Sequence, residues 1–155
     1  MANLGKSKSK STETTEVVID ASGLILGRLA SNVAKRILNG EKVTVINAEN
    51  AIISGSREYI KENYRKHLTT RTLGSQDKAP KHPRRPDNYV RRVVRGMLPW
   101  KQPKGKIAFR KLRVYIGLPE TIKTPAQSIP EALKNIRPSM AVGELMENFG
   151  WKRPQ

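Results

Sequence analysis

Residues 17–47 read VVIDASGLILGRLASNVAKRILNGEKVTVIN, and this stretch decides the fold. Its opening β-branched run predicts a buried strand. Apolar residues then recur at helical spacing from Leu26 to Leu38, and Gly40 is typical of a left-handed cap at the end of a helix. The closing KVTVIN predicts a second strand. The order strand, helix, strand favours parallel pairing and a right-handed crossover, so an α/β fold is expected.

Two helices are expected after a very short strand at 51–53. Ser56 is typical of a helix N-cap, and the buried stripe of that helix is expected at Ile60, Tyr64, His67 and Leu68. Asp87 or Asn88 is expected to cap the next helix, which ends near Gly96. The apolar face of this helix is expected at Val90, Val93, Val94 and Met97.

The rest of the chain divides into arms and extensions. Prolines and basic residues without apolar periodicity predict irregular arms, which are usually functional or disordered. The terminal tail is rich in Lys, Ser and Thr, and it fits equally well a plain disordered end or a segment that becomes ordered on RNA. The predicted segments are a flexible tail at 1–14, a core at 15–120 with arms at 69–86 and 99–106, a last strand at 112–116, and a C-terminal extension with short helices at 121–155.

Charge is concentrated in the middle of the chain. The 155 residues hold 30 Lys and Arg against 13 Asp and Glu, which gives a net charge of +17. Residues 57–113 alone hold eighteen basic and four acidic residues, a net charge of +14. A merely soluble protein intersperses its signs. A positive field of this size favours a polyanion, most commonly nucleic acid.

Composition also excludes several classes of site. There is no Cys, which rules out disulfides and thiolate metal sites, and two His are too few for a His-built metal site. No apolar run approaches the roughly 20 residues of a membrane span, and the first residues lack the apolar core of a signal peptide. We therefore expect a cytoplasmic protein with no metal and no cofactor.

The features that suggest catalysis are weak. The segment GLILGR at 23–28 follows a strand and opens a helix, where a phosphate loop would lie. It matches neither known glycine-rich pattern, so we interpret it as close packing at a helix start. Asp20 is the best single candidate for chemistry, although an Asp at a strand end more often caps a turn. No nucleophile, base and oxyanion donors come together in the pattern, so an enzyme is not expected.

The basic middle is the candidate binding segment. Arg side chains match phosphate oxygens in pairs, and Lys acts as a mobile point charge. Trp100 fits two roles equally, stacking on a base or closing the core beside Met97 and Leu98. Arg91, Arg92 and Arg95 are expected on one solvent side of a helix, serving binding rather than stability. The candidate RNA-binding residues are Lys61, Arg65, Lys66, Arg71, Lys78, Lys81, His82, Arg84, Arg85, Arg91, Arg92, Arg95, Trp100, Lys101, Lys104, Lys106, Arg110 and Lys111.

Six short stretches between about Val17 and Glu120 carry a family resemblance. They are Ile19–Ala21, Leu26–Ser31, Val45–Glu49, Ile53–Gly55, Val94–Pro99 and Leu112–Tyr115. This ordered set resembles the family of ribosomal protein thirteen of the large subunit, in its archaeal and eukaryotic branch. The resemblance implies a three-layer α/β/α fold around a small, largely parallel sheet. It also implies a structural place on the large ribosomal subunit, with large-subunit rRNA and neighbouring ribosomal proteins as partners, and no catalysis.

Two other functions compete with this hypothesis. An enzyme acting on a nucleotide is suggested by the strand–glycine–helix opening, but it needs a metal or an acidic pair that the sequence does not offer. A DNA-binding regulator needs a helix-turn-helix and a dimer surface. The basic residues of such a regulator are not expected mainly on long loops. In this chain the basic residues are expected largely on long loops.

Overall fold

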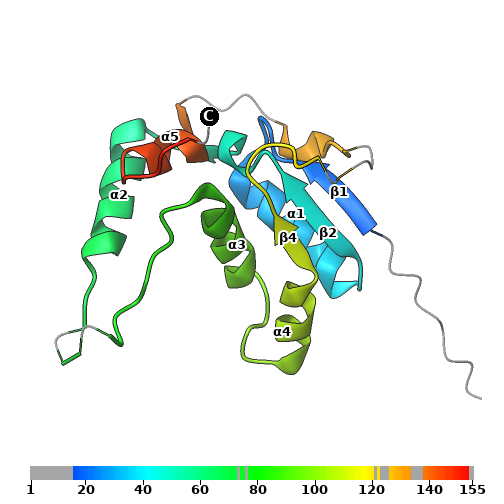
Figure 1. The fold of residues 1–155 in the computed structure, drawn as a ribbon, viewed down its shortest axis with the longest axis horizontal. Coiled ribbons are helices and arrows are strands. Elements are labelled where there is room, and N and C mark those ends of the chain that lie inside the picture. Colours follow the sequence, from blue (N-terminus) through cyan, green and yellow to red (C-terminus); the bar gives the residue numbers. More distant parts are fainter. Residues whose placement is uncertain are drawn as a thin grey trace, which may run out of the picture.

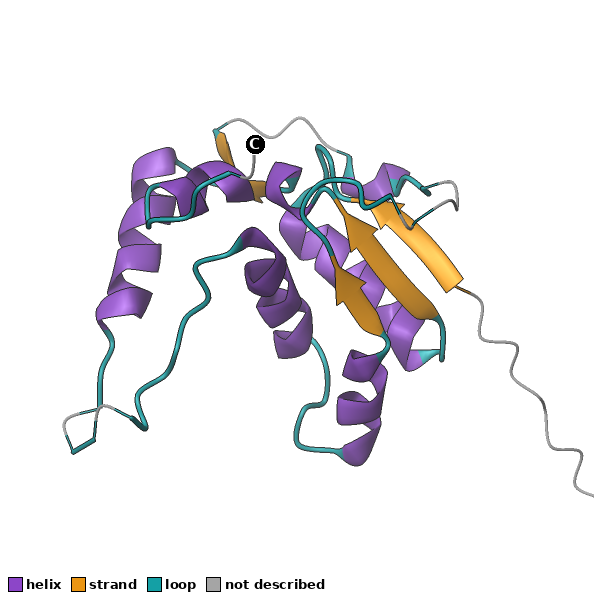
Figure 2. Ribbon diagram, viewed as in Figure 1, coloured by secondary structure: helices purple, strands orange, loops and turns teal. Residues whose placement is uncertain are grey.

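A three-stranded parallel sheet lies at the centre of the fold (Figures 1 and 2). Its strands are β1 (Glu16–Asp20), β2 (Lys42–Ile46) and β4 (Leu112–Val114), in the order β1-β2-β4. The expected α/β class and the small, largely parallel sheet are confirmed, with helices packing around the sheet. The computed structural model describes residues 16–72, 74–75, 77–120, 122, 126–133 and 138–153, so the predicted tail at 1–14 lies outside the described residues.

Helix α1 (Leu26–Leu38) makes the predicted crossover from β1 to β2. Its stripe of Leu, Val, Ile and Ala side chains is buried against the sheet, and Gly40 beyond its end has a φ of +107°, which a glycine adopts freely. Strand β2 is covered on both faces, because the consecutive residues from Val43 to Ile46 are all buried. Burial on both faces is typical of the central strand of a parallel sheet, and here it includes Thr44.

A second, two-stranded sheet joins distant parts of the chain. Strand β3 (Ile52–Ser54) pairs antiparallel with β5 (Ser139–Ala141), and α5 (Val142–Glu147) follows directly. Met140, Leu145 and Met146 of this C-terminal part are fully buried. Strand β3 was expected and β5 was not. The short 3-10 helices are η1 (Ala48–Asn50) and η2 (Pro130–Ala132).

Three helices fill the long connection between β3 and β4. They are α2 (Arg57–Thr69), α3 (Pro86–Gly96) and α4 (Pro103–Arg110). In Figure 1 these helices and the connection at 70–85 extend toward the lower part of the view, and the connection reaches farthest to the left. The predicted cap of α2 is confirmed, since the backbone N–H of Tyr59 donates to Oγ of Ser56 at 3.2 Å.

Two predictions at helix ends are wrong. Neither Asp87 nor Asn88 caps α3, because the helix already begins at Pro86, whose fixed φ and missing N–H suit a first helical position. Asp87 lies in the first turn and pairs with Arg85 at 3.2 Å. The arm expected at 99–106 is also shorter than predicted, because α4 begins within it at Pro103.

Two residues expected to be buried are exposed. Met97 was placed on the apolar face of α3, but it follows the last turn of the helix and is 43% exposed. His67 was placed in the buried stripe of α2, and it is exposed near the end of that helix. Met97 lies past the last helical turn, where helical spacing no longer sets the direction of the side chain. His67 is still within α2, and its ring lies 5.5 Å from that of His82 on the connection rather than in the core.

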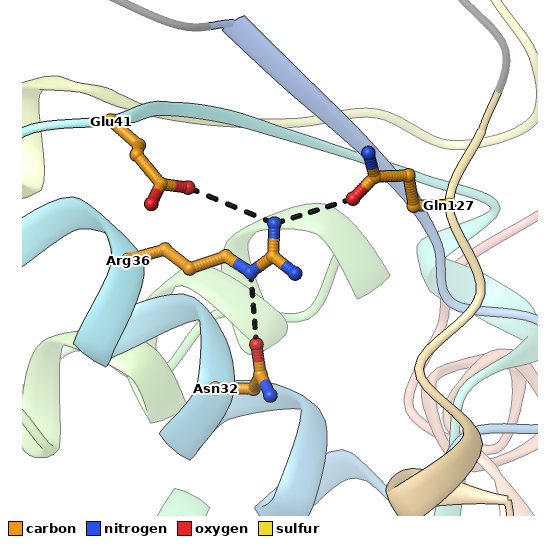
Figure 3. Close-up of polar contacts among 4 residues, drawn as sticks. All are labelled: Asn32, Arg36, Glu41 and Gln127. Carbon is orange, nitrogen blue, oxygen red and sulfur yellow. Dashed lines mark hydrogen bonds and ion pairs between the residues drawn. The ribbon is translucent and has the colours of Figure 1, made fainter.

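The outer edge of β1 is closed by a segment from far along the chain. The N–H of Asp20 donates to the carbonyl of Gln127 at 3.3 Å, and the N–H of Gln127 donates to the carbonyl of Val18 at 2.8 Å. Arg36 of α1 ties the same segment down, as Figure 3 shows. Its guanidinium donates to Asn32 Oδ1 and to Gln127 Oε1 at 3.1 and 3.3 Å, and it lies 3.7 Å from a carboxylate oxygen of Glu41.

Candidate nucleic-acid interface

The candidate RNA-binding residues lie on one continuous run of structure. Figure 1 shows α2, the connection at 70–85, α3 and α4 in succession along the same side of the molecule. We call their basic side chains the basic surface. Its members are Lys61, Arg65 and Lys66 on α2; Arg71, Lys78, Lys81, His82, Arg84 and Arg85 on the connection; Arg91, Arg92 and Arg95 on α3; and Lys101, Lys104, Lys106, Arg110 and Lys111 on and beside α4.

Few carboxylates neutralise this surface. Within the described residues, Glu62 pairs with Arg65 at 3.2 Å and Asp87 pairs with Arg85 at 3.2 Å. Both arginine side chains are more than 60% exposed, so each pair contributes little to stability. The basic surface therefore keeps most of its positive charge in the free protein.

Two arginines of α3 lie against aromatic rings. The guanidinium carbon of Arg95 is 4.5 Å from the centre of the Trp100 ring, and that of Arg91 is 5.3 Å from the centre of the Phe109 ring. The two rings meet edge to face, 5.2 Å apart. These cation–π contacts join α3 to the turn at Trp100 and to α4. They favour side-chain conformations in which both guanidinium groups lie over these rings.

Trp100 takes an intermediate position between its two predicted roles. It is half-buried and packs edge to face on Phe109. The guanidinium of Arg95 lies over its ring. Its structural contact is thus to an arginine and an aromatic ring.

Residues 81–83, at the C-terminal end of the long connection, are hydrogen-bonded to α2 and α3. The guanidinium of Arg92 donates to the carbonyl of Lys81 at 2.7 Å, and the hydroxyl of Tyr64 donates to the carbonyl of Pro83. The rings of His67 and His82 lie 5.5 Å apart. Residues 81–83 are therefore held against α2 and α3, whereas Arg71 and Lys78, nearer the tip, are exposed.

Two cavities adjoin at this fastened segment. The first, about 280 Å³, has an apolar and aromatic lining that includes Ile60, Tyr64 and Tyr89, and we call it the aromatic cavity. The second, about 310 Å³, is lined by Lys81, Arg91, Arg92, Arg95 and other residues, none of them acidic, and we call it the arginine cavity. Residues that line both cavities are His82, Pro83 and Arg92.

Charge states around the cavities follow from burial. Burial lowers the pKa of His82, and electrostatic interactions with Arg92 and His67 lower it further. Burial raises the pKa of Tyr89. Burial and Tyr89 raise the pKa of Tyr64, against the opposing effect of Arg84 and Arg92. The Tyr64 hydroxyl therefore keeps the proton that it donates to Pro83.

One candidate residue has a clear role in the fold. The ammonium group of Lys111 donates to the carbonyl of Gly40 at 2.8 Å, which satisfies a backbone acceptor just past the end of α1. Lys111 lines neither of the two cavities. Lys111 thus serves chiefly to join α1 to the end of α4.

Asp20 serves as a turn residue. One of its carboxylate oxygens accepts from the N–H of Ser22 at 2.9 Å and from the side-chain amide of Asn47 at 3.0 Å. Burial raises the pKa of Asp20, but these hydrogen bonds outweigh burial and leave the pKa lowered. Asn47 has a φ of +54°, and its bond to Asp20 helps to hold that conformation. The alternative reading of Asp20 as a turn cap is therefore correct.

Comparison with known proteins identifies the family. The family model described as Ribosomal protein L13 matches residues 14–121. The chain belongs to the ribosomal protein L13 family. Members of this family are structural components of the ribosome and not enzymes. The predicted resemblance is thereby confirmed.

Archaeal relatives cover most of the chain. A protein named large ribosomal subunit protein uL13 from Methanococcus maripaludis is 45% identical over 139 residues, which cover 88% of this chain and 98% of the relative. The protein of the same name from Methanopyrus kandleri is 46% identical over 144 residues, 88% of each chain. That from Methanocaldococcus jannaschii is 42% identical, covering 87% of this chain and 98% of its own. The archaeal type expected from the sequence is therefore confirmed.

Sequence reasoning missed the residues that hold the basic side chains in place. Phe109, Tyr64 and Tyr89 were not candidates, yet they pack against Arg91 or form the aromatic cavity. The available signal was the interleaving of aromatic and basic residues through 59–109, which is typical of RNA-binding surfaces. Among the described residues, no cluster of His, Asp or Glu suits a metal ion, and no helix is both long and apolar enough to span a membrane.

Proposed function

We propose that this protein is a structural constituent of the large ribosomal subunit that binds large-subunit rRNA through the basic surface. In this role it helps to assemble and stabilise the subunit for translation in the cytoplasm. Its other partners are neighbouring ribosomal proteins. The observation that carries the proposal is the net charge of +14 in residues 57–113, whose helices and connection lie together along one side.

The physical argument rests on counterions. A surface that neutralises phosphates releases the cations condensed on RNA, so its affinity depends steeply on salt. Arginines that are held by rings and by backbone bonds lose little entropy when they meet phosphates. Lys61 and Lys66 on α2 and Lys104 and Lys106 on α4 extend the same field to both sides of α3.

The test is the binding of the purified protein to large-subunit rRNA at several salt concentrations. With roughly six to ten phosphate contacts, affinity falls by about three to five decades between 50 and 200 mM salt. The protein is also expected to sediment with large subunits and not with small ones. A salt-insensitive affinity for rRNA would contradict the proposal, as would sedimentation with small subunits alone.

A further inference from the structure

We infer that the aromatic and arginine cavities together receive one unstacked nucleotide of RNA, with its base in the first and its phosphate in the second. This inference rests on the proposed function, because it names the chemical group that the basic surface selects. A pocket for a base adds recognition that charge attraction alone does not provide. Phosphate contacts alone position a protein on RNA without recognising any base.

The aromatic cavity suits a nucleobase. It holds about 280 Å³, and its lining includes the buried Ile60 and Tyr64 and the half-buried Tyr89. Tyr59, another lining residue, is 67% exposed, which places it at the mouth with a ring free to stack. Asn63 and His67 add polar groups to the lining. A base has apolar faces and a polar edge, and RNA-binding proteins hold unstacked bases between aromatic rings in this way.

The arginine cavity suits a phosphate. Four of its eight lining residues are Lys or Arg and none is acidic. Arg91 and Arg95 are oriented by Phe109 and Trp100. The guanidinium groups of such arginines match phosphate oxygens with paired, charge-assisted hydrogen bonds.

The wall between the cavities fits the ribose that separates a base from its phosphate. His82, Pro83 and Arg92 line both spaces, so the cavities are one residue layer apart. This wall is held in position by the bonds from Tyr64 to Pro83 and from Arg92 to Lys81. A site prepared in this way loses little entropy on binding.

An apolar side chain from a neighbouring protein would also fit the aromatic cavity alone. It would leave the adjacent cationic cavity without a role, and it has no need of exposed Tyr59 or of the polar groups beside it. A nucleotide accounts for both cavities at once. The observations therefore favour RNA, and the protein ligand becomes an outcome of the test.

The test compares a short single-stranded oligoribonucleotide with an abasic strand of the same length and charge, each with the full-length protein. The wild-type protein is expected to bind the base-containing strand about fivefold or more tightly than the abasic one. In Tyr59→Ala this preference is expected to disappear, while affinity for the abasic strand stays unchanged. Leu118→Ala is the matched control, because Leu118 is 65% exposed and lines neither cavity.

A second variant tests the phosphate half. Arg95→Gln is expected to weaken binding of both strands equally and to lower the slope of log affinity against log salt by about one. If Tyr59→Ala leaves both affinities unchanged or lowers both equally, no base enters the aromatic cavity and the inference is overturned. Steep salt dependence without any base preference would overturn it while leaving the proposed function intact. Salt-independent binding of both strands would instead refute the proposed function.

Discussion

The guanidinium of Arg95 is positioned both to pack within the protein and to meet a phosphate. It lies 4.5 Å from the centre of the Trp100 ring, yet the side chain is exposed. From the sequence, the three arginines of α3 were expected to serve binding alone. The structure adds a contact within the fold for each of them, to Phe109, to the Lys81 carbonyl and to Trp100.

Replacing Arg95 by Lys separates charge from shape. Arg95→Lys keeps the positive charge but loses the flat group that lies on Trp100, so we expect a loss of at most about 1 kcal/mol in unfolding free energy. RNA affinity is expected to fall with an unchanged salt slope, because only the paired hydrogen bonds are lost. Urea unfolding and RNA titrations at several salt concentrations measure both effects.

Lys101→Gln is the control for Arg95, since Lys101 is exposed and makes no ring contact that the structure describes. This change is expected to reduce the salt slope by about one without any loss of stability. If Lys101→Gln and Arg95→Lys lost equal amounts of unfolding free energy, the contact between Arg95 and Trp100 would not account for the loss in Arg95→Lys.

His82 makes stability depend on pH. Its folded-state pKa lies below the ordinary value of 6.5, so the unfolded chain binds more protons in the window between these two values. Stability is therefore expected to fall as pH decreases through 6.5, and His82 contributes no pH dependence well above that value. Urea midpoints of the wild type and of His82→Asn across this range measure the difference. If the urea midpoint of the wild type changed with pH in parallel with that of His82→Asn, a lowered pKa of His82 would be contradicted.

The side chains best predicted from sequence are those whose role is local. The Ser56 cap and Gly40 depend on neighbours three or four residues away, so their spacing was sufficient. The positions of Met97 and His67 depend on where a helix ends and on what packs there. Helical periodicity carries no information on either point.

At the scale of elements, α4 was missed because its buried face is made of small residues. Gly105 and Ala108 are the buried positions of this helix, and neither adds to an apolar stripe. Pro103 at the first turn was the one signal of a helix start. Strand β5 was missed for a different reason, since three residues have no periodicity and their pairing with β3 is set by tertiary contacts.

Gly105 is expected to tolerate no side chain. A Cβ there would lie 2.6 Å from the carbonyl carbon of Pro99, so either the turn at Trp100 or the start of α4 must move. Gly105→Ala is expected to cost about 1–3 kcal/mol of unfolding free energy. Gly96→Ala is the control, because a Cβ at Gly96 meets no atom within 4 Å. Urea unfolding compares the two variants, and equal stabilities would show that the turn yields easily.

In the connection at 70–85, residues 81–83 are held against two helices, whereas Arg71 and Lys78, nearer the tip, are exposed. The sequence predicted an irregular arm at 69–86, and we expect its tip to be mobile in the free protein and to become ordered on RNA. The backbone carbonyls of Pro83 and Lys81 accept hydrogen bonds from Tyr64 and Arg92. Loops that are positioned by a rigid scaffold often carry binding residues.

For the whole molecule, the βαβ order and the charge distribution were predictable because each extends over many residues. The parallel pairing of β1 with β2 through the α1 crossover confirms what the sequence indicated. The cavities were not predictable. They arise where α2, the connection and α3 meet, and no local pattern encodes that meeting.

Salt is expected to affect the free protein and its complex in opposite directions. Like charges on the basic surface repel one another across distances comparable to the Debye length, about 10 Å at 0.1 M salt. Moderate sodium chloride should therefore raise the melting temperature of the free protein while it weakens RNA binding. Thermal unfolding across the same salt series checks this. A melting temperature that falls with added salt would show that favourable ion pairs outweigh the repulsion.

The pairing of β1 with Gln127 bears on how the protein is made. A nascent chain grows from its N-terminus at roughly 5–20 residues per second. Gln127 is therefore synthesised seconds after β1, and until it arrives the outer edge of β1 lacks these backbone partners and Arg36 lacks its bond to Gln127 Oε1. An open strand edge invites pairing with other chains. Strand β1 is thus synthesised early, but its outer edge gains its backbone partners late. The rate of translation therefore sets how long that edge is left without them.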